Sequence, residues 1–133
     1  MAKIVLTNVN VSLGGTDISS SVAQTELKMT AEEKDTTGFG STAKTRIGGL
    51  KDHSVTFEIH QQYSAIESLI YPLVGATAAV IIKPDGTAVS SANPSYAFNV
   101  FVSEWSPVAG AVGDLATASV SWPIDGAITK TVA

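Results

Sequence analysis

A two-residue alternation at residues 53–60 constrains the fold more than any other feature of this sequence. Mainly apolar side chains occupy every second position, and polar side chains fill the positions between them. The first set is His53, Val55, Phe57 and Ile59, and the second is Ser54, Thr56, Glu58 and His60. Since successive side chains of a strand point to opposite faces of a sheet, this pattern predicts a strand with one buried and one solvated face.

Similar runs predict strands at residues 4–13, 22–32, 77–83, 96–105 and 115–122, with a short extension at 17–19. The run 96–105 is apolar on both faces, which fits a central strand or a strand that faces both a core and a neighbouring copy. The last run is followed by the sequence Pro123-Ile124-Asp125-Gly126 and a short tail. Roughly seven strands separated by turn signals predict a mainly β fold, either an antiparallel β-sandwich or a partly closed barrel.

One short flanking α-helix is predicted at residues 64–74. Ser64 and Glu67 have the spacing of a capping box, in which each side chain bonds a free backbone N–H of the first turn. Pro72 and Gly75 end the helix early. An apolar stripe at helical spacing indicates that the helix packs on one side of a sheet; it consists of Ile66, Leu69, Ile70 and Leu73.

Composition restricts the possible functions. The 133 residues fit a single domain spanning 1–133, and the absence of cysteine excludes disulfides, thiol nucleophiles and Cys-type zinc sites. Net charge is −4 and the eight basic residues are scattered, which is unlike a protein that grips nucleic acid. No signal peptide and no apolar run of roughly 20 residues is visible. We therefore expect a chain made in the cytoplasm without a membrane partner.

The residues that could carry chemistry do not form a convincing site. Asp52, His53 and Ser54 are the residue types of a hydrolytic triad, but consecutive strand residues alternate faces and cannot converge. Glu58 and His60 share a face, yet no third ligand stands nearby for a metal. His53 fits a hydrogen-bonded core histidine. We expect no catalytic, cofactor-binding or metal-binding residues and no enzymatic activity.

A glycine-rich stretch at residues 32–52 interrupts the strand pattern. It contains Gly38, Gly40, Gly48 and Gly49, and it predicts a long interaction loop at about 33–49 that contributes nothing to the core. The alternative is a flexible hairpin tip without a binding role. Phe39 is the one large apolar residue at its centre and is typical of an anchor that seats in a partner's pocket. Basic side chains of the stretch are expected to meet acidic groups on a neighbour; these are Lys44, Arg46 and Lys51.

Several short motifs resemble the tail tube (major tail) proteins of long-tailed bacteriophages and related prophages. The first two are Asp35-Thr36-Thr37-Gly38-Phe39-Gly40 and Thr45-Arg46-Ile47-Gly48-Gly49-Leu50-Lys51-Asp52. A strand alternates after the second motif, a short helix ends near Tyr71-Pro72-Leu73, and a late strand follows Val112-Gly113-Asp114-Leu115. The resemblance covers roughly residues 17–127.

This resemblance implies a β-sandwich with a flanking helix, whose copies form hexameric rings that stack into a hollow tube for DNA. The long loop would then join neighbouring subunits, a role that falls on Asp35, Thr36, Thr37, Phe39, Lys44, Arg46 and Lys51. Further partners would be tape measure and tail terminator or tail tip proteins, and DNA would pass without specific binding. The chain would be assembled in the host cytoplasm and reside in the virion tail.

A DNA conduit needs a lining that does not hold phosphates, so an acidic or neutral surface is expected around the lumen. Polar strand faces could supply it; the candidates are Glu26, Glu32 and Glu58, with Lys28 and His60 diluting the negative charge.

Other functions remain open at this stage. The chain could be another small virion component, such as a head decoration or tail terminator protein. It could also be a carbohydrate-binding β-sandwich, with Trp105 or Trp122 exposed for stacking on sugar rings.

Overall fold

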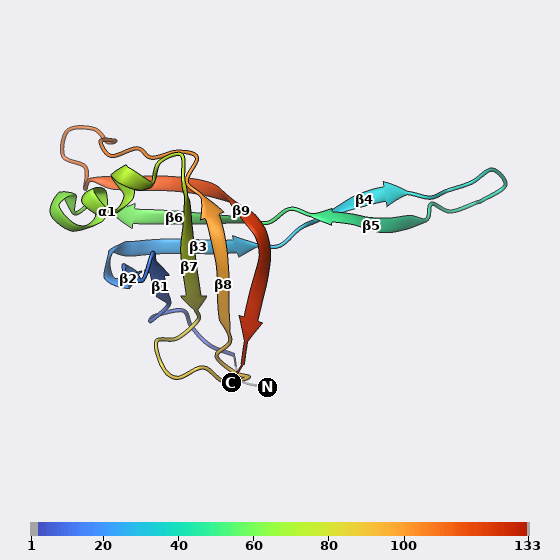
Figure 1. The fold of residues 1–133 in the computed structure, drawn as a ribbon, viewed down its shortest axis with the longest axis horizontal. Coiled ribbons are helices and arrows are strands. Elements are labelled where there is room, and N and C mark those ends of the chain that lie inside the picture. Colours follow the sequence, from blue (N-terminus) through green and yellow to red (C-terminus); the bar gives the residue numbers. More distant parts are fainter. Residues whose placement is uncertain (1–2, 133) are drawn as a thin grey trace.

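The computed structural model describes residues 3–132 and consists of a curled antiparallel sheet with a projecting hairpin arm (Figure 1). The sheet has seven strands in the order β2-β1-β7-β8-β9-β6-β3. Their bounds are β1 (Asn10–Leu13), β2 (Thr16–Asp17), β3 (Val22–Lys28), β6 (Ser54–His60), β7 (Thr77–Lys83), β8 (Ser95–Phe101) and β9 (Thr117–Thr131). The arm is a separate two-stranded sheet of β4 (Ala31–Asp35) and β5 (Arg46–Lys51). The predicted mainly β, partly closed architecture is confirmed.

The long strand β9 joins the two halves of the sheet. Its first half pairs with β6 through Thr117–Pro123, and its second half pairs with β8 through Ile124–Thr131. Figure 1 shows β9 running beside β6 and β3 and then bending to run beside β8 and β7. The bend folds the sheet over a single core, and it leaves β8 in the centre of the strand order, as its two apolar faces predicted.

The core is centred on the pair formed by Trp122 and Phe57. Both side chains are buried, and their rings meet edge to face with centroids 5.9 Å apart. The indole N–H of Trp122 donates to the backbone oxygen of Glu104 over 2.8 Å, so the one polar atom of this large side chain is satisfied. The alternation of β6 accounts for this core, since His53, Val55, Phe57 and Ile59 are all buried.

Several expected strand boundaries are wrong, including that of the run 96–105, of which only Ser95–Phe101 is a strand. The run at 4–13 is a strand only from Asn10, where pairing with β7 begins. The predicted break after Trp122 is absent, because β9 continues to Thr131. Pro123 lies where β9 passes from β6 to β8, and Gly126, with φ of +94°, lies beside a register shift between β8 and β9. Glycine tolerates this backbone conformation at no steric cost, so the shift is absorbed without ending the strand.

The predicted helix at 64–74 is present only as irregular helical turns. A π-turn at Tyr63–Glu67 leads into one α-turn, α1 (Ser68–Ile70), and a 3₁₀-turn at Tyr71–Leu73. The capping box does not form, because the backbone N–H groups of Ile66 and Glu67 bond the carbonyl of Gln62 instead. The apolar stripe is nonetheless used: Ile66 and Ile70 are buried, and Leu69 and Leu73 pack against the core. No helix within residues 3–132 is long and apolar enough to span a bilayer.

Replacing Trp122 with alanine should lower the free energy of unfolding by about 3–5 kcal/mol, because it removes the largest buried side chain and leaves a cavity. Urea unfolding followed by far-ultraviolet circular dichroism measures the change. Phe39→Ala is the matched control: its ring is fully exposed and its loss should cost less than about 0.5 kcal/mol. Equal effects of the two substitutions would contradict this description of the core.

Candidate functional site

The arm is the most unusual feature of the molecule, because beyond its base it packs against no other element of residues 3–132. Figure 1 shows it extending away from the curled sheet, and every residue from Lys28 to Asp52 is exposed. The expected loop at 33–49 is therefore wrong in part: β4 and β5 pair in antiparallel register, and only residues 36–45 lie outside strands. An isolated two-stranded hairpin is only marginally stable in water, and beyond its root no other element of residues 3–132 covers this one.

Glycine permits β5 rather than preventing it. A Cβ atom at Gly49 would come within 3.2 Å of the Cβ and 3.3 Å of the backbone oxygen of Glu32 on β4. These contacts are tighter than ordinary packing allows, so glycine lets the two strands approach closely at this point. The glycine-rich stretch was expected to interrupt the strands, yet Gly48 and Gly49 both lie within β5.

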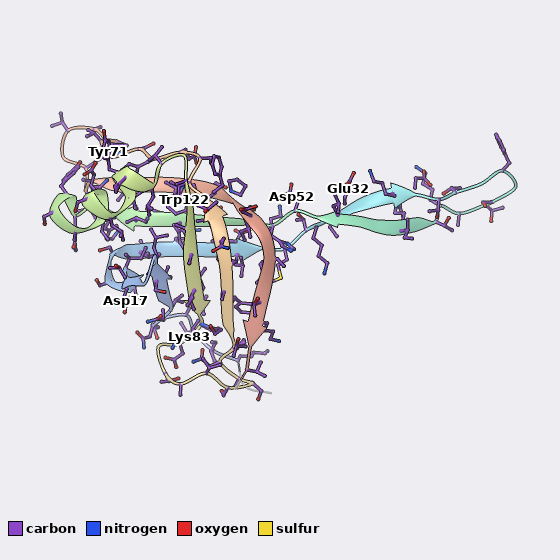
Figure 2. The ribbon with its side chains drawn as sticks, viewed as in Figure 1. Asp17, Glu32, Asp52, Tyr71, Lys83 and Trp122 are labelled. Atoms are coloured by element: carbon purple, nitrogen blue, oxygen red, sulfur yellow. The ribbon has the colours of Figure 1, made fainter. Side chains whose placement is uncertain are left out.

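The arm is rooted in the sheet by hydrogen bonds at Thr30 and Asp52. The backbone N–H of Thr30 donates to Nδ1 of buried His53 over 3.2 Å, and the N–H of Asp52 donates to the oxygen of Thr30 over 3.0 Å. The chain leaves the sheet here, which divides the single strand expected at 22–32 into β3 and β4. The expectation that His53 is a hydrogen-bonded core histidine is confirmed. Figure 2 shows Asp52 at this root and Glu32 further out along the arm.

Four charged side chains of the arm form two ion pairs with one another. Nε of Arg46 lies 2.6 Å from Oε1 of Glu33, and Lys34 pairs with Glu32. Arg46 was expected to meet an acidic group on a neighbour; it has a partner within its own chain, and the contact with a neighbour stays a prediction. All four groups are exposed, so each pair contributes only about 0–1 kcal/mol and remains free to exchange partners.

The threonines near the tip cross-link the two sides of the arm. The N–H of Thr36 donates to the oxygen of Thr45 over 2.9 Å, and the N–H of Thr45 donates to the hydroxyl of Thr37 over 2.9 Å. The N–H of Thr37 donates to Asp35 over 2.8 Å. The hydroxyl and then the backbone N–H of Thr37 hold the pKa of Asp35 below 3.8. Beyond these bonds, Phe39 stands fully exposed at the end of the arm.

Four of the five predicted lumen residues lie on one polar face. Register pairs Gln24 with Glu58 and Glu26 with Thr56, while Lys28 is opposite Ser54, so these side chains share the outer face of β3 and β6 with His60. The same face continues onto β9, where Ser119 and Ser121 are exposed. Glu32, the fifth residue, belongs to the arm instead. The expectation that it shares a strand with Glu26 is wrong because the chain leaves the sheet after Lys28.

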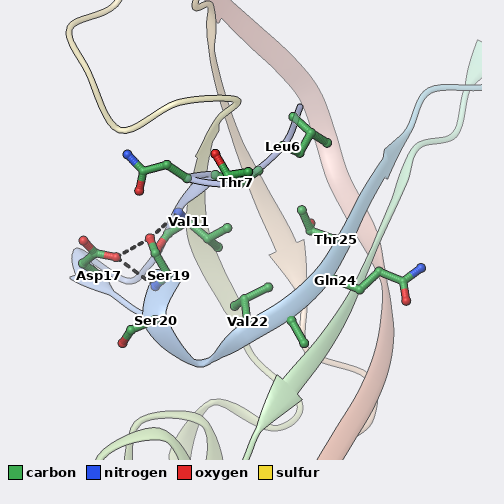
Figure 3. Close-up of a pocket in the computed structure, with 12 residues that line it drawn as sticks. Leu6, Thr7, Val11, Asp17, Ser19, Ser20, Val22, Gln24 and Thr25 are labelled. Carbon is green, nitrogen blue, oxygen red and sulfur yellow. Dashed lines mark hydrogen bonds between the residues drawn. The ribbon is translucent and has the colours of Figure 1, made fainter. Parts of the chain in front are cut away.

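The sheet is open along a groove beside β3. The groove encloses about 700 Å³ between β3, which contributes Val22 and Thr25, and the N-terminal segment and β1, which contribute Leu6 and Val11 (Figure 3). The hydroxyl and backbone N–H of Ser19 both bond Asp17 and hold its pKa below 3.8. β3 is the last strand in the order of the sheet. Within residues 3–132, the side of its backbone that faces away from β6 therefore has no strand partner.

The remaining chemical candidates do not converge on a site. Within residues 3–132, no three His, Asp or Glu side chains lie together as metal ligands. Trp122 is buried and cannot stack on a sugar, while Trp105 is half-buried and packs against the core. Tyr96 is likewise half-buried, and Phe101 is partly exposed on β8.

Comparison with known proteins identifies the fold. No protein-family model and no curated protein matches the sequence. The structure matches a chain from the virion of a native gene transfer agent particle with a TM-score of 0.76 and 14% identity, covering 98% of this chain and 100% of that one. It also matches a chain from the tail of an empty gene transfer agent particle with C6 symmetry, with a TM-score of 0.65, 14% identity and coverage of 94% and 95%.

A third match is a chain from the sixfold-symmetrised baseplate of an anti-feeding prophage, with a TM-score of 0.56, 8% identity and coverage of 99% and 98%. The three structures share this fold over nearly the whole of both chains. The chain thus has the fold of phage-like tail and virion proteins, and the fold expected from the resemblance to tail tube proteins is confirmed.

The carboxyl group of Asp35 should titrate with a midpoint below 3.8, because Thr37 stabilises its ionised form. The contribution of these bonds to order at the tip is present above the ordinary aspartate pKa and is lost as pH falls through the lowered value. Carboxyl-carbon chemical shifts followed by NMR measure the midpoint. Thr37→Ala removes the hydroxyl and should move the midpoint upward; a midpoint in the unaltered chain that is not lower than in the Thr37→Ala variant would contradict this geometry.

Proposed function

We propose that this protein is a structural subunit of a phage-like tail, whose copies form hexameric rings that stack into a hollow tube for DNA. The observation that carries the proposal is the arm, in which every residue from Lys28 to Asp52 is exposed and Phe39 contacts nothing. An exposed hairpin ending in an aromatic residue gains stability when it seats on another surface. An arm that joins one subunit to the next uses all of these features.

The comparisons support this role. Two of the matched chains come from assemblies described with sixfold symmetry, one a tail and one a baseplate. A ring with closed symmetry uses two different patches on each subunit, one at each side. Strand β3 offers one such patch, because its free edge can add a strand from a neighbour. We infer that this edge lies at the contact between subunits of one ring.

We infer that the polar face of β3, β6 and β9 lines the lumen. Its charged side chains are Glu26, Lys28 and Glu58, joined by His60, and serine, threonine and glutamine fill the positions between them. Phosphates bind clustered basic groups, and this face carries one lysine beside two carboxylates. DNA could therefore move past it without being held.

The other predicted partners follow from the same role. Tape measure and tail terminator or tail tip proteins would meet the ends or the inside of the tube, and assembly would take place in the host cytoplasm before the subunit becomes part of the virion tail. A structural subunit of this kind needs no catalytic group, in agreement with the expectation from the sequence.

Concentrated purified protein should form striated hollow tubes in negative-stain electron micrographs, with sixfold symmetry in end views. The matched variant replaces residues 33–49 with an Asn-Gly turn and should give no tubes, because it removes most of the arm. Its free energy of unfolding should stay within about 1 kcal/mol of the unaltered chain, since the arm packs on nothing. Single rings or compact particles from the unaltered chain would instead favour a tail terminator or head decoration protein.

A further inference from the structure

A second cavity lies at the base of the arm, beside the residues that follow the end of β3. It encloses about 820 Å³ between the root of the arm and the second half of β9. Its apolar wall consists of Met29, Leu50, Tyr96, Ile124 and Ile128. Met29 is 51% exposed and Leu50 is 81% exposed, so this wall faces water in the isolated subunit. Such a concave apolar surface is a binding site for an apolar group.

The chain itself offers a group of the right chemistry. Phe39 is the most exposed large apolar side chain among residues 3–132. It is flanked by Gly38 and Gly40, so no neighbouring side chain would meet the rim of a pocket before the ring entered it. Gly38 has neither a positive φ nor any atom within 4 Å of the position a Cβ would take. Nothing in its own subunit requires glycine there, and a close approach to another molecule would.

Phe39 cannot fill the pocket of its own subunit. The four steps from Ala31 to Asp35 alone carry the chain roughly 13 Å outward at about 3.3 Å per residue, and the tip lies beyond them. Figure 1 shows the tip at the end of the arm furthest from the sheet, whereas the pocket lies at the root. The two complementary surfaces are therefore held apart within one copy and can meet only between copies.

We propose that the pocket at the root of the arm receives the tip of the arm from a second copy, with Phe39 against the apolar wall. The inference rests on the proposed tail function and deepens it, because it names the surface on which the arm docks. Each copy carries one tip and one pocket at different places. When two copies bind through such a contact, one tip and one pocket remain free. Further copies can therefore add at both ends.

The charges around the pocket also favour the tip of the arm as the group that binds there. Lys51 and Lys130 line the pocket, no acidic side chain lines it, and neither lysine has an ion-pair partner within residues 3–132. Asp35 lies near the tip, ionised and held by Thr37. Seating the tip would bring this carboxylate toward the lysines. Lys44 is the other charged residue of the tip and gives a control position.

Disulfide trapping tests the contact directly, because the chain contains no cysteine. Ser41 shares the turn of Phe39, its N–H bonding the oxygen of Gly38, and Ala127 lines the pocket. Mild oxidation of the Ser41→Cys, Ala127→Cys double variant at assembling concentration should give a ladder of covalent trimers and larger species. Each single variant can give dimers at most.

Two controls distinguish cross-links made by a tip bound in the pocket from cross-links made by random collision. Adding Phe39→Ala to the double variant should reduce the ladder, since loss of an anchor aromatic typically weakens binding by roughly thirtyfold or more. Pairing Ser41→Cys with Ala79→Cys, on the exposed face of β7, should give no ladder. A ladder of equal yield with Ala79→Cys, or one unaffected by Phe39→Ala, would overturn the inference.

Electron micrographs of the same samples separate this inference from the proposed function. Tubes without a ladder would show that the pocket does not bind the tip, and the proposed tail function would be unaffected. A ladder without tubes would support binding of the tip in the pocket and would overturn the proposed assembly into a tube. The absence of both would overturn both.

Charge reversal gives an independent readout. Lys130→Glu and Asp35→Lys should each lower the ladder yield, and the two together should restore part of it. Lys44→Glu, which makes the same tip more acidic, should not lower the yield. Failure of the combined variant to exceed either single variant would remove the ion pair from the proposal.

Discussion

Strand β9 is the element on which the rest of the structure depends. It pairs with β6 at one end and with β8 at the other, and its bend turns one continuous sheet into two facing layers. Trp122 lies on β9 before the bend and packs against Phe57 of β6, so the strand that shapes the sheet also fills the core. The arm is rooted next to this region, at Thr30 and His53, and the backbone oxygen of His53 accepts a bond from Ile124 of β9, so the direction of the arm is set beside the bend.

Much of the sheet could be predicted from the sequence, because local alternation and burial agree. The run 77–83 coincides with β7 at both ends, and the alternation at 53–60 places Phe57 and Ile59 in the core and Glu58 and His60 on the polar face. The bend in β9 could not be predicted. Pro123 and Gly126 are ordinary signals for the end of a strand, and only the change of partner from β6 to β8 explains why the strand continues.

The position of the arm in the chain could be predicted from the sequence, but its two-stranded structure could not. Its glycines and mixed charges identified residues 33–49 as a segment outside the core, and Phe39 is indeed exposed at the end of it. The same residues concealed β5, since Gly48 and Gly49 are poor strand formers that are accepted here because Glu32 approaches so closely. Intramolecular pairing of Arg46 with Glu33 depends on cross-strand register, which no local pattern in the sequence encodes.

The narrow root gives the arm mechanical properties of its own. A few hydrogen bonds around Thr30 and Asp52 connect a long, unsupported hairpin to the sheet. The arm can therefore rotate about a hinge at its root. A rotation of roughly 10° there would displace the end of a lever roughly 20 Å long by about 3–4 Å. In a filament joined by such levers, curvature would be distributed over many small rotations, and no subunit would have to deform its core for the filament to bend.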